Sequence, residues 1–450
     1  MYRRAKQLGQ ASLVLLAFIL LFSVTVNSQQ RTQAQQHYQK GLELLKKGDL
    51  DGSIEAFKKA ILLKPNEAGA HYYLGYALGI KGQLVDAIAE LQKAISLNPE
   101  LGEAHYYLGA ARWFSKDVDG AIAALRAAVR LMPQHADAHY YLGLSLQKND
   151  QLDEAIGAFQ AAIKLRPDML PAYNSLGLAL MQKRDPAGAI AAFNDALKLD
   201  SSNMVAQLNL GMVLIQKGDY AAAVEQYRRI IVQAPESAEA HYNLGLALKQ
   251  KDELADAEVE LRKAIELQPR LHEAHYILGS ILMQQSKLED AAAALKRAID
   301  VKPDYAEAHF ALGTVMQQQG NFVGAVAALR QALVHAPNAP EIHNALGNAL
   351  RQTGDIESAR VEFQEAARLN KIKSNQQAAM FATNTGIAKL KAGNVDEAIE
   401  TFQRAVQLDP TNSQAYYNLA KAFQKKGQMA AARTAEQKAR ELDPRIKPLP

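Results

Sequence analysis

The chain has 450 residues, of which 22% are charged and 48% hydrophobic, and its formal net charge is +4. This composition excludes general disorder, and so small a net charge gives no reason to expect binding to nucleic acid. Cysteine is absent, which excludes disulfides, thiolate metal sites and a lipid-modified N-terminal cysteine.

The first 28 residues differ from the rest. Arg3, Arg4 and Lys6 form a basic start, and an apolar run follows from Ala11 to Val26. With short residues after this run, residues 1–28 indicate a secretory signal peptide. The alternative is an uncleaved membrane anchor, although the run is shorter than the about 20 residues that span a bilayer. We expect the following residues to be exported, either periplasmic or secreted, or anchored at the inner membrane outside the cytoplasm.

A pattern of 34 residues recurs after this segment, and residues 238–271 show it clearly. In its first half, side chains on one helical face recur at i, i+3, i+4 and i+7, namely His241, Leu244, Gly245 and Leu248. A second helix is predicted from Ala257, Leu261 and Ala264, and it ends before Pro269. Two such short helices have too little core to offset their chain entropy, so the unit must stack on neighbours.

The pattern fits twelve repeats. Ten start at residues 34, 68, 102, 136, 170, 204, 238, 272, 306 and 340 and run without a gap to residue 373, and two more start at 379 and 413 and end at 446. Position 8 of the repeat is Gly in eleven of the twelve, and position 20 is Ala in all but the first. Position 32 is Pro in ten repeats. Small residues at fixed places let the two helices approach closely.

In period, small residues and prolines, this pattern resembles the tetratricopeptide repeat, a helix–turn–helix unit. The resemblance covers residues 34–446 and implies an all-α fold, a right-handed α-solenoid in which repeats contact only their neighbours. It departs from the family pattern at position 4, where His stands in eight repeats in place of the usual large aromatic residue.

The junction between the tenth and eleventh repeats is irregular. Lys371 replaces the terminating proline, and residues 374–378 are inserted before the last two repeats at 379–446. We predict either a longer second helix or a hinge at 371–378. At the two ends of the array, Lys40 and Glu436 stand where apolar residues are usual. We therefore expect a complete array and a monomer.

Positions 2, 5, 9 and 12 lie on a second face of the first helix, and position 6 borders them. In proteins of the family that this chain resembles, this face lines a concave groove that binds the partner. Positions 5 and 6 are rich in Tyr and Asn, which suit an extended peptide. The candidates are Tyr72, Tyr73, Tyr106, Tyr107, Tyr140, Tyr141, Asn174, Asn209, Tyr242, Asn243, Tyr276, Phe310 and Asn344. Each could instead be repeat framework, but the paired tyrosines of repeats two to four are denser than a framework requires.

The third repeat adds two further candidates. Arg112 replaces the usual Leu at position 11, and Trp113 and Phe114 follow it. Trp113, the only tryptophan, either fills the space of the missing Leu or contacts a partner at the groove.

The histidines at position 4 do not predict a metal site. They are His37, His71, His105, His139, His241, His275, His309 and His343. Equivalent helices pack no closer than about 8 Å, whereas zinc ligands lie about 2 Å from the ion. We predict no metal and no cofactor. Every glycine that could cradle a phosphate follows the repeat, and no Ser, His and acid set falls outside it, so we expect no enzyme.

The sequence therefore predicts a non-enzymatic scaffold of the cell envelope that holds a protein or an extended peptide in its groove. An alternative from another class is a substrate-presenting arm of a glycosyltransferase system, because similar repeats precede the catalytic part of protein O-linked N-acetylglucosamine transferases. Catalysis would then reside on another chain. Incubation with labelled nucleotide sugars would separate the two hypotheses.

Overall fold

The computed structural model describes residues 30–449, and throughout this range the regular structure is helical. The predicted signal peptide or anchor at residues 1–28 lies outside the described residues. Among the helices that are described, none is both long and apolar enough to cross a bilayer. The chain divides into two compact parts after Pro235.

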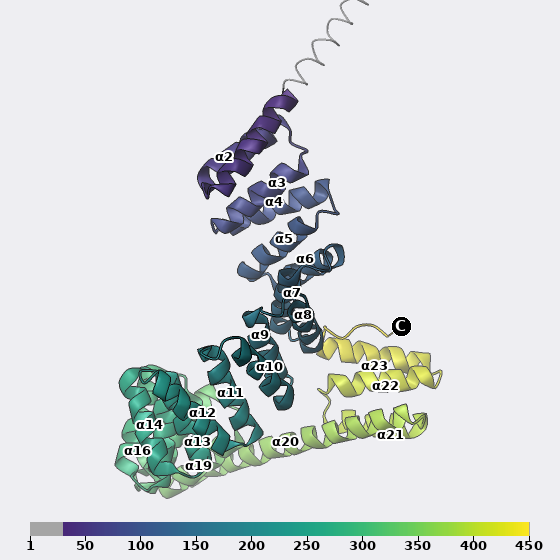
Figure 1. Ribbon diagram of the computed structural model, residues 1–450. Helices are drawn as coiled ribbons and strands as arrows, with labels where there is room; N and C mark the ends of the chain where they lie inside the picture. The colour runs from purple at the N-terminus through teal and green to yellow at the C-terminus, as the bar shows by residue number, and fades with distance from the viewer. Residues whose placement is uncertain (1–29, 450) are drawn as a thin grey trace, which may run out of the picture. The chain divides into compact units, whose positions relative to one another are not determined.

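Each repeat forms the expected pair of antiparallel helices (Figure 1). Residues 30–46 are helical and precede the first labelled element. The first helices are α3 (Ala68–Ile80), α5 (Gly102–Phe114), α7 (Ala136–Lys148), α9 (Leu170–Gln182), α11 (Met204–Lys217), α13 (Ala238–Gln250), α15 (His272–Gln284), α17 (Ala306–Gln318), α19 (Pro340–Gln352) and α22 (Ser413–Lys425). The second helices are α2 (Leu50–Leu63), α4 (Leu84–Leu97), α6 (Val118–Leu131), α8 (Leu152–Leu165), α10 (Pro186–Leu199), α12 (Tyr220–Gln233), α14 (Leu254–Leu267), α16 (Leu288–Val301), α18 (Phe322–His335), α21 (Val395–Leu408) and α23 (Met429–Leu442).

The irregular junction is a single helix. Helix α20 (Ile356–Lys391) combines the second helix of the tenth repeat, the five inserted residues and the first helix of the eleventh. Of the two alternatives for residues 371–378, the structure has the longer helix. Between Leu369 and Ala379, however, none of its residues is buried.

Close approach of the two helices of a repeat explains the glycine at position 8. The side chain at position 24 lies against it, and in the fifth repeat Phe193 is fully buried there. A Cβ atom on Gly177 would lie 2.5 Å from the Phe193 ring, which is too close for a real contact. Ala189, at position 20 of the same repeat, is also fully buried. Small residues at positions 8 and 20 are therefore a packing requirement, as the sequence predicted.

The turn between the helices has a left-handed residue at position 15. Glycine takes this place in seven repeats, as Gly82 does with φ of 79°. The other five have Lys116, Asp150, Arg184, Asp252 and Ser286, with φ between 58° and 67°. The next residue often caps the second helix, and Asp117 accepts a hydrogen bond from the Gly120 amide at 3.0 Å.

Position 4 connects consecutive repeats by a hydrogen bond. The His275 Nε2 atom lies 2.9 Å from the Pro269 carbonyl oxygen, at position 32 of the preceding repeat. The same bond forms in the sixth repeat, where the Gln207 amide donates to the Ser201 carbonyl at 2.7 Å, and in the fifth, where the Tyr173 hydroxyl donates to the Pro167 carbonyl at 3.2 Å. The residues at position 4 therefore form a polar link between repeats.

This link predicts a contrast between two substitutions of His275. His275→Gln should keep the free energy of unfolding nearly unchanged, because Gln207 already makes the bond in this fold. His275→Leu should lower it by about 1 kcal/mol, since the hydrogen bond to the Pro269 carbonyl is lost. Urea unfolding monitored by circular dichroism measures both. Equal midpoints for the two variants would show that packing of the ring, and not the bond, sets the residue type.

Candidate functional site

The first helices lie on the inner side of the stack within each compact part. Consecutive first helices pack closely on one another, as α3, α5 and α7 do. Consecutive second helices such as α4, α6 and α8 lie farther apart, and α6 and α8 are joined by the ion pair of Arg126 with Glu154 at 2.6 Å. The face with positions 2, 5, 9 and 12 is thus the one on which neighbouring repeats converge. Side chains on this face can act together on one ligand.

Aromatic rings form a continuous row across repeats two to four. The Tyr72 and Tyr73 rings are 4.6 Å apart between centroids, and the Tyr72 and Tyr107 rings are 6.0 Å apart. The Tyr106 ring lies 4.8 Å from Tyr107 and 6.1 Å from Tyr141. The structure therefore brings the predicted tyrosines of three repeats together.

A hollow opens in this row between α3, α5 and α7, and we call it the aromatic pocket. Its volume is about 200 Å³. It is lined by Gly75, Tyr76, Gly79, Ile80, Leu84, Leu91, Tyr106, Tyr107, Ala110, Ala111, Phe114 and Tyr141. Phe114 lies at the edge of the pocket, where it is 60% exposed, and its ring is 6.1 Å from the Tyr141 ring. The lining is apolar apart from the tyrosine hydroxyls, so it suits an apolar or aromatic side chain.

Eight of the twelve residues that line the pocket were missed by the sequence prediction, and three of these eight stand on the groove face. Tyr76 stands at position 9, where its ring lies 4.6 Å from Tyr107. Gly79 at position 12 and Ala110 at position 9 leave the space that larger residues fill elsewhere, such as Met181 at position 12 and Leu178 at position 9. The sequence could have indicated these three residues, because positions 9 and 12 both belong to the groove face.

The other predicted residues lie apart from the pocket or are engaged by the protein itself. Trp113 is half-buried against the core of the neighbouring repeats. Tyr140 lies between Tyr141 and the buried Phe159, 5.5 Å and 6.1 Å from their rings. The Asn174 amide donates to the Asn203 side chain at 3.3 Å, and this side chain in turn caps α11.

Five predicted residues belong to the compact part that begins at Glu236, and Asn209 lies half-buried in the first part. Tyr276 lies 5.2 Å from the Tyr305 ring. Phe310 packs on the core around Leu329. Tyr242 and Asn344 are half-buried, and Asn243 is buried. None of these five lines the aromatic pocket.

Acidic side chains lie beside the tyrosines. Glu103, on α5, is exposed, and Asp137, on α7, is half-buried and pairs with Arg166 at 2.9 Å. Burial, followed by the neighbouring Tyr76, raises the pKa of Tyr107 to about 12. Burial likewise raises the pKa of Tyr72, Tyr106 and Tyr141. These hydroxyls are therefore protonated donors at neutral pH.

The raised pKa values predict a loss of stability in alkali. Phenol groups of the unfolded chain titrate at 10.0, below the folded value of about 12 for Tyr107. The unfolded chain therefore loses these protons first, so stability is fully present below pH 10 and falls as pH rises toward 12. Circular dichroism between pH 9 and 12 measures the transition. Tyr107→Phe should move it to higher pH, and an unchanged transition in this variant would contradict the assignment.

Within residues 30–449, no three His, Asp or Glu side chains come together as metal ligands would. The residues of the aromatic pocket offer hydroxyl groups and apolar surface, and they include no acid–base or nucleophile pair. The arrangement is suited to binding.

Comparison with known families supports the same fold. A family model described as "Tetratricopeptide repeat" matches residues 106–169, 140–204, 208–272 and 310–378, which together make up more than half of the chain. The chain belongs to the tetratricopeptide-repeat family. Three related tetratricopeptide models also match. The first matches residues 41–79, 80–113, 279–320 and 386–427, the second residues 180–235 and the third residues 413–446. The predicted all-α solenoid of helix–turn–helix repeats is confirmed. Tetratricopeptide repeats are typical of non-catalytic protein-interaction scaffolds.

Several solved structures are similar to parts of this tetratricopeptide chain. One described as "Crystal structure of MamA protein" is 34% identical, covers 38% of this chain and 92% of its own, and has a TM-score of 0.36. MamA from Desulfovibrio magneticus is 27% identical, with 38% and 97% coverage and a TM-score of 0.36. The APC/C hetero-tetramer Cut9-Hcn1 is 15% identical, with 92% and 94% coverage and a TM-score of 0.34. The comparison with curated proteins gave no match.

Proposed function

We propose that the protein is a non-enzymatic scaffold that holds an extended segment of a protein partner along its first helices. An apolar or aromatic side chain of that segment enters the aromatic pocket, and the tyrosine hydroxyls donate hydrogen bonds to its backbone. The observation that carries this proposal is the open hollow between Tyr76, Tyr107 and Tyr141, on the face where three repeats converge. A preformed surface of this kind limits the ordering cost of binding.

We also propose that the scaffold is exported to the cell envelope. The support is the basic start at Arg3, Arg4 and Lys6 and the apolar run from Ala11 to Val26. Fractionation of cells that produce the full chain, with N-terminal sequencing of the product, tests this. A product that keeps Met1 and stays in the cytoplasm would refute export without affecting the groove.

Selection of displayed random peptides on the purified full chain tests the binding proposal. Selected peptides should share a large apolar or aromatic residue, because only such a residue fills the pocket. Their binding should be lost in a variant with Tyr76→Ala and Phe114→Ala, and kept in Val232→Ala, whose side chain is 84% exposed on α12. Binding that survives the double substitution would place the site elsewhere.

A further inference from the structure

A second candidate surface lies on the eleventh repeat, where the regular covering helix is missing. In other repeats, first-helix positions 4, 7 and 11 face the second helix of the preceding repeat. In the eighth repeat, for example, His275, Leu278 and Leu282 face α14 across one shared hollow, and α14 contributes Ile265 and Glu266. Every regular junction therefore places a helix against this face.

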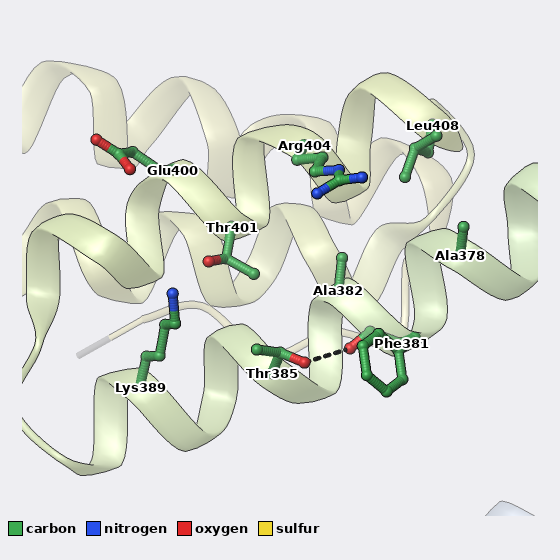
Figure 2. A pocket seen from close by; sticks show the side chains of 9 residues that line it. All are labelled: Ala378, Phe381, Ala382, Thr385, Lys389, Glu400, Thr401, Arg404 and Leu408. Carbon is green, nitrogen blue, oxygen red and sulfur yellow. Dashed lines mark hydrogen bonds between the residues drawn. The ribbon is translucent and has the colours of Figure 1, made fainter.

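In the eleventh repeat the same positions are Ala382, Thr385 and Lys389 on α20. The preceding second helix cannot fold back over them, because it is the first half of α20 itself. Figure 2 shows the hollow between α20 and α21. The eighth repeat has a similar hollow, but α14 lines one side of it, whereas no preceding second helix lines this one. The volume of the hollow between α20 and α21 is about 440 Å³, and Thr401, Arg404 and Leu408 line its other side. The Phe381 side chain at its edge is 75% exposed.

The open face extends beyond the hollow along α20. Lys371, Ser374 and Ala378 precede Thr385 at spacings that place all four on one side of the helix. All three are exposed. From Lys371 to Lys389 the stripe is roughly 27 Å long at a rise of about 1.5 Å per residue. This is long enough to hold a helix of 14 residues, about 21 Å, such as α14.

The charge of this stripe is one-sided. From Ala366 to Val395 the chain has no Asp or Glu, and its cations are Arg368, Lys371, Lys373, Lys389 and Lys391. Arg368 and Lys389 pair with carboxylates outside this stretch, Glu365 at 2.5 Å and Glu397 at 3.0 Å. Arg404 adds a further cation across the hollow, and Glu400 is the one acid among the residues that line it. A complementary partner would carry carboxylates.

We propose that this face binds an acidic amphipathic α-helix of a partner protein, which occupies the place that a second helix takes in the regular repeats. Its carboxylates would lie toward Lys371 and Arg404, and its apolar side would pack on Phe381 and Ala382. A hollow between two helices, bounded by side chains on both sides, fits a helix better than a flat anionic membrane. This site is separate from the aromatic pocket and does not depend on the function proposed for it.

A peptide with the sequence of Leu254–Leu267 is a suitable probe, because α14 covers the equivalent face in the eighth repeat and has four acids against two bases. The peptide is stapled to hold it helical, labelled and titrated against the full chain by fluorescence anisotropy. Saturable binding is expected. Phe381→Ala and Arg404→Glu should each weaken it about tenfold, whereas Lys148→Glu on α7 should not.

Three controls decide the outcome. A scrambled peptide of the same composition should not bind, and equal binding by it would reduce the effect to charge alone and overturn the proposal. Gly79→Met, which fills the aromatic pocket, should leave probe binding unchanged, so the two sites fail independently. The third control is sedimentation of the full chain with anionic vesicles in place of the peptide. If the chain binds vesicles, Phe381→Ala loses this binding and the peptide does not bind, the face is assigned to a membrane and a helical partner is refuted.

Discussion

Gly79→Met should weaken peptide binding at the aromatic pocket strongly while the protein becomes more stable. A Cβ atom on Gly79 meets only the Ala87 Cβ, at 3.9 Å, so the backbone has room for a side chain. Met already occupies the same position as Met181 and Met283. Replacing a glycine inside a helix adds up to about 1 kcal/mol of stability. The new side chain fills the pocket, so the affinity for selected peptides should fall at least about tenfold.

Anisotropy titrations and urea unfolding of the same preparation measure both effects of Gly79→Met. Ala110→Leu should act in the same direction, because it fills the pocket from the neighbouring helix. Ser280→Leu, at the same position 9 of the eighth repeat, is the matched control and should leave peptide affinity unchanged. A stabilised Gly79→Met protein that binds peptides normally would show that the pocket is not the site.

Gly177→Ala should have the opposite effect on stability, although it also replaces a glycine inside a helix. Its Cβ atom would lie 2.5 Å from the Phe193 ring, which is fully buried and cannot move away. We expect the free energy of unfolding to fall by about 1–3 kcal/mol, the usual cost of overpacking a core.

Gly157, on the adjacent helix α8, provides the comparison. A Cβ atom there meets nothing within 4 Å, so Gly157→Ala should stabilise by up to about 1 kcal/mol. Thermal unfolding of the two variants should move the midpoint in opposite directions. The twelfth repeat supports this reasoning, since it has Ala420 at position 8 and also lacks the large side chain at position 24, where Glu436 stands. A stable Gly177→Ala protein would mean that Phe193 has more freedom than its burial indicates.

The repeated helix pairs could be predicted from the sequence because their determinants are local and recur with one period. Gly177 and Phe193 are sixteen residues apart, and their relation holds in almost every repeat. The aromatic pocket could be predicted only in part. Its tyrosines stood out as large residues, whereas its volume arises from what Gly79 and Ala110 lack. Whether three helices leave a gap there depends on their relative placement, which no local pattern contains.

The role of Asn174 and the conformation of residues 371–378 also could not be predicted from local sequence. Asn174 looked like a ligand-binding side chain, but the cap of the next first helix lies within its reach and uses its amide. The alternatives at 371–378 could not be separated by sequence, because the inserted residues contain neither Pro nor Gly and so permit a helix without requiring one. The choice depends on how the last two repeats pack.

Helix α20 also bears on how the protein unfolds. Repeats usually transmit stability through the interface with their neighbours, so a solenoid melts as a cooperative series. Between Leu369 and Ala379 that interface is replaced by a helix with no buried residue, and the core around Leu346 ends before the core around Phe402 begins. We expect the two C-terminal repeats to be more weakly coupled to the rest than regular repeats are to their neighbours. A substitution that damages one core should then affect mainly its own side of the junction.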